Sequence, residues 1–487
     1  METQRSPWVA LWTLCLGFFM ILLDMTIVAV ANPAIMDDLH TDISNVIWVT
    51  SAYLLAYAVP LLITGRLGDR YGPKILYLTG LALFTVSSLW CGLSTSIEML
   101  IGARVVQGLG AAMLTPQTMS VITRIFPPER RGAAMGAWGS VAGVASLVGP
   151  IAGGLLVDGL GWQWIFFINV PIGVVAFALA LRFVPDLPTH EHKFDLVGVG
   201  LSAVGMFLLV FGLQEGNDHN WDAWIWAMII AGLLVLAGFI YYQSRDIGEP
   251  LVPLALFKIR NFALSNVGIT AMGAAMTSLM LPAFFYLEAV RDLSPTKSAL
   301  VFAPTAVFSG VLAPIVGRWV DKAHPRVIPT IGFAMAAIAI AWLAERMHPD
   351  APIWTMMFPI ILLGISMACI WAPLSATATH DLPLDQAGAG SGIYNTTRQV
   401  GSVLGSAAIS ALITARMSAN GLHSSTNQNS GALPAFVVHP FSSALAESML
   451  LPAAILVVGC CASALFARHA KDKAARQAAA APAEVVA

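Results

Sequence analysis

Asp24 stands deep inside the first long apolar run of this sequence, which extends from residue 8 to residue 34. Asp24 is sixteen residues into the run, so in a helix it lies about 24 Å along it, near the middle of a bilayer. Apolar surroundings disfavour an ionised carboxylate, and a carboxyl at this depth can therefore take up and release a proton. The alternative is a buried acid that only hydrogen-bonds a neighbouring helix. We take Asp24 as the candidate proton-coupling residue.

Arg104 lies in a second apolar run, 98–123, at a depth comparable with that of Asp24. Such a pair can compete, because Arg104 would hold Asp24 ionised until a proton or a substrate releases it. In the alternative, Arg104 is structural and only bonds backbone carbonyls. We predict that the two residues act together in proton coupling.

Two more charged residues, Glu288 and Arg398, are candidates for a second titratable group or a substrate site. Glu288 ends the run 262–287, where it either pairs with Arg291 at helical spacing or lies at the mouth of a cavity. Arg398 lies slightly inside the middle of the run 390–415, and structural and functional roles are equally open for it.

The apolar runs that position these residues dominate the chain. Of its 487 residues 57% are hydrophobic and 11% are charged, whereas a soluble globular protein carries about 25% charged residues. Backbone polar groups must be satisfied inside lipid, so runs of about 20 apolar residues predict an all-α membrane protein. We expect fourteen spans, at residues 8–34, 45–64, 75–95, 98–123, 133–157, 163–183, 195–214, 222–243, 262–287, 298–317, 327–345, 353–374, 390–415 and 443–467.

The distribution of basic residues predicts the orientation of these spans. With a cytoplasmic amino terminus, 19 of the 25 Lys and Arg residues fall in cytoplasmic segments and 4 in the outer loops. This is a strong positive-inside signal and predicts that both termini are cytoplasmic in a cell (inner) membrane.

An internal repeat divides the spans into two sixes. The segment "GRLGDRYGPKI" (65–75) matches "GRWVDKAHPRV" (317–327) without a gap, and "FPPERRGAAMG" (126–136) matches "LPLDQAGAGSG" (382–392). Parallel repeats of this kind are typical of transporters. The repeat predicts a six-helix bundle at 1–187, a two-helix insert with linkers at 188–258, a second six-helix bundle at 259–467 and a cytoplasmic tail at 468–487.

The repeated segment is predicted to be a tight cytoplasmic loop between the second and third spans. Gly65 and Gly72 permit close backbone geometry, and Arg70 fits the positive-inside pattern. Asp69 and its repeat counterpart Asp321 are unexpected there, because an acid needs a partner such as an Arg side chain or the positive end of a helix. A plain positive turn is the alternative.

Four motifs in the right order resemble the major facilitator superfamily, and within it the fourteen-span drug:proton antiporter family. They are "LDMTIVAVANPAI" (23–35), with Ala29 and Asn32 off the pattern, "GRLGDRYGPK" (65–74), with Pro73 off it, "LIGARVVQGLGAA" (100–112) and "ASLVGPIAGG" (145–154). The resemblance covers nearly the whole chain and is weakest over 416–487.

The resemblance implies roles for two groups of residues. Asp69 would act as a conformational latch by docking at the start of span thirteen near Ala389, and by the repeat Asp321 would face Gly132, so that both bridges hold only when the cytoplasmic side is shut. The "ASLVGPIAGG" motif marks antiporters. In it, residues that would bend the helix or let a neighbour pack closely are Gly149, Pro150, Gly153 and Gly154.

We therefore expect a proton-driven antiporter that exports amphipathic, lipophilic or cationic drug-like compounds by alternating access. A dedicated exporter of one endogenous metabolite or lipid is the alternative, and a sensor or a membrane-embedded enzyme is less favoured because the histidines fall in loops or at span ends. No nucleotide-binding Gly-Lys-Thr/Ser loop occurs, so direct coupling to ATP is not expected. We expect no cofactor and no enzyme activity. The expected partners are a small-molecule substrate, protons and the lipid bilayer, without nucleic acid, and the protein is expected to be a monomer.

Overall fold

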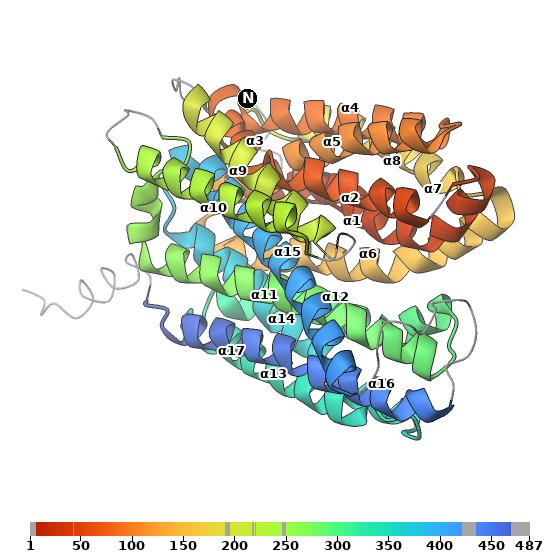
Figure 1. Ribbon diagram of the computed structural model, residues 1–487. Coiled ribbons are helices and arrows are strands. Elements are labelled where there is room, and N and C mark those ends of the chain that lie inside the picture. The colour runs from red at the N-terminus through yellow and green to blue at the C-terminus, as the bar shows by residue number, and fades with distance from the viewer. Residues whose placement is uncertain are drawn as a thin grey trace, which may run out of the picture.

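The computed structural model describes residues 6–41, 43–189, 195–216, 219, 221–245, 250–420 and 435–468. The predicted tail, 468–487, lies outside these residues apart from its first position. Every regular element within the described ranges is a helix (Figure 1). The expectation of an all-α protein is thereby confirmed.

The first half of the bundle comprises the helices from α1 to α8. They are α1 (Pro7–Asp38), α2 (Ile43–Ala58), α3 (Leu61–Tyr71), α4 (Pro73–Gly92), α5 (Ile97–Ile125), η1 (Pro128–Arg130), α6 (Arg131–Leu160), α7 (Trp164–Phe167) and α8 (Asn169–Phe183). Local chemistry sets several of these boundaries. Ser96 caps α5 by accepting a hydrogen bond from the Met99 amide, and Pro73 occupies the first turn of α4, where a missing N–H costs nothing.

A helical hairpin and the second half follow. The hairpin is α9 (Leu196–Glu215) and α10 (Ala223–Gln243), and η2 (Leu254–Lys258) leads into the second half. That half consists of α11 (Arg260–Phe285), the π-helical turn η3 (Tyr286–Val290), α12 (Pro295–Val320), α13 (Val327–Arg346), η4 (Ile353–Met356), α14 (Met357–His380), η5 (Leu384–Gln386), α15 (Ala387–Ala419), α16 (Ala435–Ser448) and α17 (Leu450–Ala464).

By length and composition, the described helices provide thirteen candidate membrane spans, or fourteen if one bent pair counts as a single span. Thirteen segments are long and apolar enough to cross a membrane alone, and α2 with α3 makes one more span that is bent by 46°. Pro60 stands at this bend and accounts for it, because proline cannot continue the hydrogen-bond ladder of a helix. Counted in this way, six candidate spans precede the α9–α10 hairpin and six follow it.

The segment "GRLGDRYGPK" is not the loop that the sequence predicts. Residues from Gly65 to Tyr71 continue α3 as a regular helix, and only Gly72 leaves it, with φ at 96°. Gly65 lets α3 pack closely against α15, because a Cβ at this position would collide with the backbone of Gly388. The glycines at 65 and 72 thus do separate things: one lets two helices touch, and the other ends a helix.

The two halves lie side by side and share two helix seams. In Figure 1 the first half is red to yellow and the second is green to blue. One seam joins α6 to α12, where Gly132 and Gly136 face Gly317 closely, and the other joins α3 to α15. The absence of side chains at these positions lets the backbones of the two halves come into contact.

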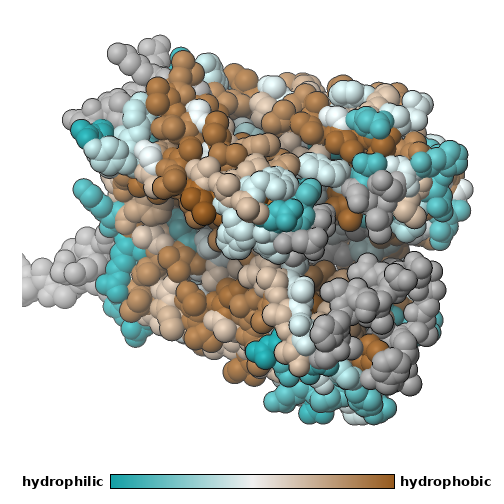
Figure 2. Space-filling model, in the orientation of Figure 1, coloured by the Kyte–Doolittle hydropathy of each residue, from teal (hydrophilic) through white to brown (hydrophobic). Residues whose placement is uncertain are grey.

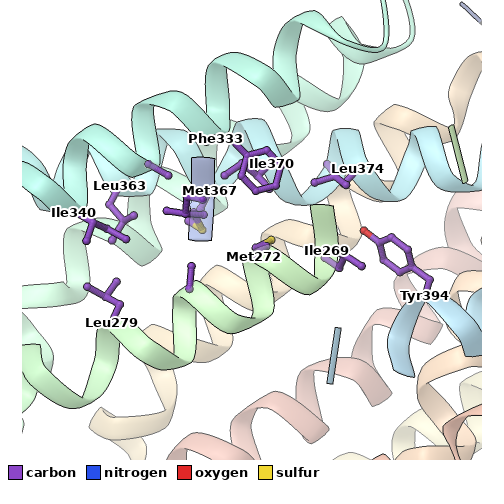
Figure 3. Packing of buried hydrophobic residues seen from close by; sticks show 14 of the residues in the cluster. Ile269, Met272, Leu279, Phe333, Ile340, Leu363, Met367, Ile370, Leu374 and Tyr394 are labelled. Carbon is purple, nitrogen blue, oxygen red and sulfur yellow. The ribbon is translucent and has the colours of Figure 1, made fainter. Parts of the chain in front are cut away.

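The interior of the second half is a packed apolar core. Its members include Ile269 and Leu279 of α11, Phe333 of α13 and Ile370 of α14, all fully buried (Figure 3). The same buried cluster continues into α1, α5 and α6 of the first half, and close packing of this kind resists deformation.

The exposed surface is apolar over most of the bundle length. In Figure 2 brown, apolar residues cover the middle of the visible face, and teal, polar residues gather toward both ends. This pattern is the one that a lipid bilayer requires of a helix bundle.

The α9–α10 hairpin packs on both halves at once. Met206 and Val210 of α9 form one buried cluster with Leu55 of α2 and Val403 of α15. The hairpin therefore lies over the seam between α2 and α15.

Candidate functional site

Asp69 lies at the junction of the two halves, with no exposed surface. Its carboxylate accepts hydrogen bonds from the backbone amides of Gly388 and Ala389, both at 2.8 Å, and from the Arg124 side chain. The two amides belong to the first turn of α15, where the helix dipole attracts negative charge. We call the end of the bundle that carries this contact the latch end.

Asp321 makes the corresponding contact in the other half of the repeat. It follows directly after α12 and accepts hydrogen bonds from the backbone amides of Gly132, at 2.7 Å, and Ala133, at 3.1 Å. These amides begin α6. Each half therefore contributes one carboxylate and one helix amino terminus to the latch end.

The basic residues of the segment do not share one role. The Arg66 side chain is buried. Lys74 pairs with Asp186 at 3.2 Å, and Arg70 is half-buried with its guanidinium 5.2 Å from the Tyr71 ring. Of these three, only Lys74 and Arg70 reach the surface.

Arg131 is a cross-half contact that the sequence reasoning missed. Its buried guanidinium donates to the carbonyls of Thr379, at 2.5 Å, and His380, at 3.2 Å, which end α14 in the second half, and to Thr123 at 2.6 Å in its own half. A signal existed, because a basic residue at the start of a helix opposes the dipole and needs acceptors elsewhere. Arg131 thus makes a third contact between the two halves at the latch end.

Asp24 and Arg104 meet inside the first half, both without exposed surface. Arg104 Nη1 lies 2.5 Å from Asp24 Oδ2, and its Nε donates to the Val49 carbonyl at 3.1 Å. The two residues that the sequence singled out for proton coupling therefore form one buried ion pair. Arg104 thus bonds a carboxylate as well as a backbone carbonyl.

Two amide side chains complete the surroundings of Asp24. Gln107 donates to Asp24 Oδ1 at 2.9 Å and accepts from Arg104 at 2.6 Å, and Asn169 donates to Asp24 Oδ1 at 3.2 Å. Asn169 was missed, although an amide in the apolar run 163–183 is itself a signal of a buried polar contact. Together with Arg104, these donors give both oxygens of the Asp24 carboxyl a hydrogen-bond partner.

Tyrosine rings connect this ion pair to Arg398. The Arg104 guanidinium lies 4.1 Å from the Tyr53 ring centroid, Tyr53 stacks on Tyr57 at 6.2 Å, and Arg398 donates to the Tyr57 hydroxyl at 3.2 Å. Tyr57 belongs to the first half and Arg398 to the second. A continuous set of contacts thus runs from the ion pair across the seam.

A cavity of about 670 Å³ opens in the second half beside this contact. Glu288 and Arg398 both line it, and the rest of its wall is mainly methionine and aromatic: Met272, Met276, Met280, Leu281, Phe284, Phe285 and Trp371, with Gly273, Thr277, Ser402 and Ser406. Arg291 does not pair with Glu288, because its guanidinium donates to the carbonyls of Pro349 and Ala351. We call the end of the bundle that carries Glu288 the mouth end.

The predicted antiporter helix, α6, is fitted closely against α1. A Cβ at Gly149 would collide with Thr26, and one at Gly153 would press on Ile27, so α1 passes over these two glycines just beyond Asp24. Gly154 is different, since nothing lies within 4 Å of its Cβ position, and its predicted packing role is wrong. Pro150 stays within the continuous helix from Arg131 to Leu160.

Comparison with known proteins agrees with this architecture. The family model of the Major Facilitator Superfamily matches residues 14–406. An uncharacterized MFS-type transporter of Mycobacterium tuberculosis is 55% identical over 470 residues, covering 95% of this chain and 81% of that protein. The multidrug export protein EmrB of Escherichia coli is 32% identical over 411 residues, covering 83% and 80%.

The solved structure of the proton:xylose symporter XylE has the same fold, with a TM-score of 0.64 at 12% identity, covering 94% of this chain and 95% of that one. The chain belongs to the Major Facilitator Superfamily. It is a multi-pass membrane transporter and not an enzyme, and its relatives include drug exporters of the type that the sequence motifs indicate.

Replacing Asp69 by Asn should loosen the latch end, because an amide carries no charge for the α15 dipole and only one acceptor oxygen. We expect the ratio of open to closed latch ends to rise about 2- to 30-fold. Spin labels on Tyr71→Cys and Leu384→Cys, both exposed at this end, in a background without the native cysteines, would report the opening as a longer distance. Asp186→Asn, an exposed acid at the same end, is the control, and identical distance distributions in wild type and Asp69→Asn would contradict a latch.

The latch end should also respond to pH through Asp321. Burial, aided by the neighbouring Glu129 carboxylate, raises the pKa of Asp321 from 3.8 to about 6, although the Gly132 and Ala133 amides lower it. Opening exposes this carboxyl to water and returns its pKa toward 3.8, so the closed state binds the proton more tightly between pH 6 and 4. Asp321 bonds the Gly132 and Ala133 amides and, among the described residues, lacks an arginine partner such as Arg124, which pairs with Asp69. Its burial therefore outweighs the attraction of its carboxylate to the helix, and acidification from pH 7 to 5 should favour closure by up to about tenfold.

The same spin-label pair measures this shift, since it lies apart from Asp321. Asp321→Asn should remove the corresponding part of the pH dependence, because an amide does not titrate. An Asp321→Asn protein with the full pH response of the wild type would show that the response arises elsewhere.

Proposed function

We propose that this protein is a proton-driven secondary active exporter of amphipathic compounds, lipophilic or cationic, that works by alternating access. The observation that carries the proposal is the fully buried ion pair of Asp24 and Arg104. Ionisable pairs at mid-membrane depth are expensive, and their usual use is in proton or ion coupling. The similarity to a multidrug export protein supports export over uptake.

We propose further that the latch end faces the cytoplasm of a cell (inner) membrane. The excess of Lys and Arg in the segments of that end supports this orientation, and both described termini lie there. With the latch end shut by Asp69, Asp321 and Arg131, the cavity that carries Glu288 belongs to the outward-facing state.

Proton entry would act by changing the partner of Arg104. A proton on Asp24 neutralises the carboxylate and leaves the guanidinium without its counter-charge, so the ion pair is weakened from within. The contacts through Tyr53 and Tyr57 give this change a route to the cavity side. The α6 helix, which touches both α1 and α12, would carry the accompanying movement across the seam.

The driving force is sufficient for concentrative export. At a membrane potential of roughly 150 mV, one charge moving inward supplies about 3.5 kcal/mol. Each 1.4 kcal/mol sustains about another tenfold of substrate gradient. The methionine and aromatic lining of the cavity suits varied lipophilic compounds, because methionine side chains adapt their shape.

Asp24→Asn should abolish transport driven by an imposed pH gradient in a protein that still folds but is less stable, because Arg104 loses its counter-charge. The amide keeps the hydrogen bonds to Asn169 and Gln107 in part but cannot carry a proton. Inverted membrane vesicles with a pH-sensitive dye and a panel of lipophilic compounds provide the assay. The exposed Asp37→Asn on the same helix is the control, and full activity of Asp24→Asn would remove this residue from the mechanism.

Glu288→Gln should weaken the binding of cationic substrates more than that of neutral ones, because only a cation is attracted by the carboxylate at the mouth end. We expect the apparent KM for cations to rise about 2- to 5-fold, the effect of one partly exposed charge. Glu345→Gln removes an exposed acid near the same end of the bundle and is the control. Equal losses for cationic and neutral compounds would assign Glu288 to a structural role.

A further inference from the structure

Arg398 differs from Arg104 in having no carboxylate partner. No acid among the described residues lies within ion-pair distance of its guanidinium, and its side-chain acceptor is the Tyr57 hydroxyl at 3.2 Å. A guanidinium has five N–H donors, so most of its donor capacity is unused. A cation inside a membrane protein is costly without a counter-charge, which indicates that something else supplies one.

The unused donors of Arg398 lie on the wall of the cavity. Its guanidinium carbon is 5.7 Å from the Trp371 ring centroid, and Met272 and Met276 line the same wall. Ser402, one helical turn further along α15, adds a hydroxyl on the same face. A cation, a flat indole and flexible thioethers thus surround one part of the cavity.

Glu288 does not supply the missing charge, because it lies at the other end of the cavity. Gly273 contacts the backbone of Arg398, and Glu288 follows Gly273 by fifteen residues on the same continuous helix. This spacing corresponds to about 22 Å. The deep end of the cavity is therefore cationic and the mouth end is anionic.

We propose that the deep end of the cavity is an anion subsite for planar aromatic compounds that carry an ionised oxygen, a carboxylate or a phenolate. The oxygen binds the Arg398 guanidinium, which presents a planar fork that suits carboxylates, and the ring system lies against Trp371 and the methionines. This inference rests on the proposed exporter function and extends its substrates from cations to aromatic anions.

An anionic substrate changes the electrical balance of transport. Exchange of one proton inward for one monoanion outward moves two charges in the same electrical sense, so the membrane potential alone drives it. Exchange of one proton for one monocation moves no net charge and responds only to the pH gradient. The two classes of substrate are therefore distinguishable by their driving force as well as by their affinity.

The test is binding to the purified full chain in lipid nanodiscs, without any gradient. Isothermal titration would compare anthraquinone-2-carboxylate with its neutral carboxamide and with 2-(trimethylammonio)anthraquinone, which share one ring system. We expect the carboxylate to bind about tenfold or more tightly than the carboxamide, the usual effect of a charge-assisted hydrogen bond. Arg398→Gln should remove that preference, and Arg398→Lys should keep part of it.

Arg416→Gln is the matched control, because Arg416 lies on the same helix, is paired with Glu447 and does not line the cavity. Equal affinities for carboxylate and carboxamide in the wild type, or an unchanged preference in Arg398→Gln, would overturn the subsite. Should Arg398→Gln fail to fold, Arg398→Lys decides, since an undiminished preference there would show that the planar fork is not used.

Transport in vesicles separates this proposal from the exporter function on which it rests. With a membrane potential and no pH gradient, we expect uptake of the carboxylate and none of the ammonium compound. Uptake of the ammonium compound alone would overturn the anion subsite. Selective binding of the carboxylate together with no gradient-driven transport of any compound would support the subsite and reject the exporter.

Discussion

Two opposite charges, on Asp24 and Arg104, lie 2.5 Å apart inside the first half, with no water-accessible surface on either. Removing one member of such a pair typically costs about 3 to 5 kcal/mol, because the other is left as an uncompensated buried charge. The surrounding structure follows from this constraint. Gln107 and Asn169 orient the carboxylate, Tyr53 covers the guanidinium, and the glycines of α6 let α1 be held in place around them.

The latch end also depends on buried charged side chains, but each of its contacts is weaker. Asp69 and Asp321 are carboxylates whose partners are mostly backbone amides at helix amino termini, and such contacts are worth about 0.3 to 2 kcal/mol each. Contacts of this size can bias a conformational equilibrium without locking it. Arg131 makes the converse contact, because its positive side chain bonds the carbonyls at the carboxyl end of α14, where the helix dipole is negative.

Much of this architecture follows from the sequence, because hydropathy sets the spans and the repeat relates the halves. The partners of Asp69 and Asp321 followed from the resemblance and the repeat together. The helical conformation of residues 65–71 could not be predicted from the sequence, because glycines that permit a turn also permit close helix packing. Only the neighbouring backbone of α15 decides between the two. Arg131, Asn169 and Tyr57 were missed because their partners lie on helices far away in the chain, which no local pattern identifies.

The hairpin of α9 and α10 affects how compounds dissolved in the bilayer can reach the boundary between the two halves. Since α9 packs on Leu55 of the first half and on Val403 of the second, it covers the seam between α2 and α15 on the lipid side. A compound dissolved in the bilayer therefore meets α9 at this face of the bundle. Any movement of one half against the other would have to displace α9 from Leu55 or from Val403, so the hairpin ties such a movement to a change in its own packing.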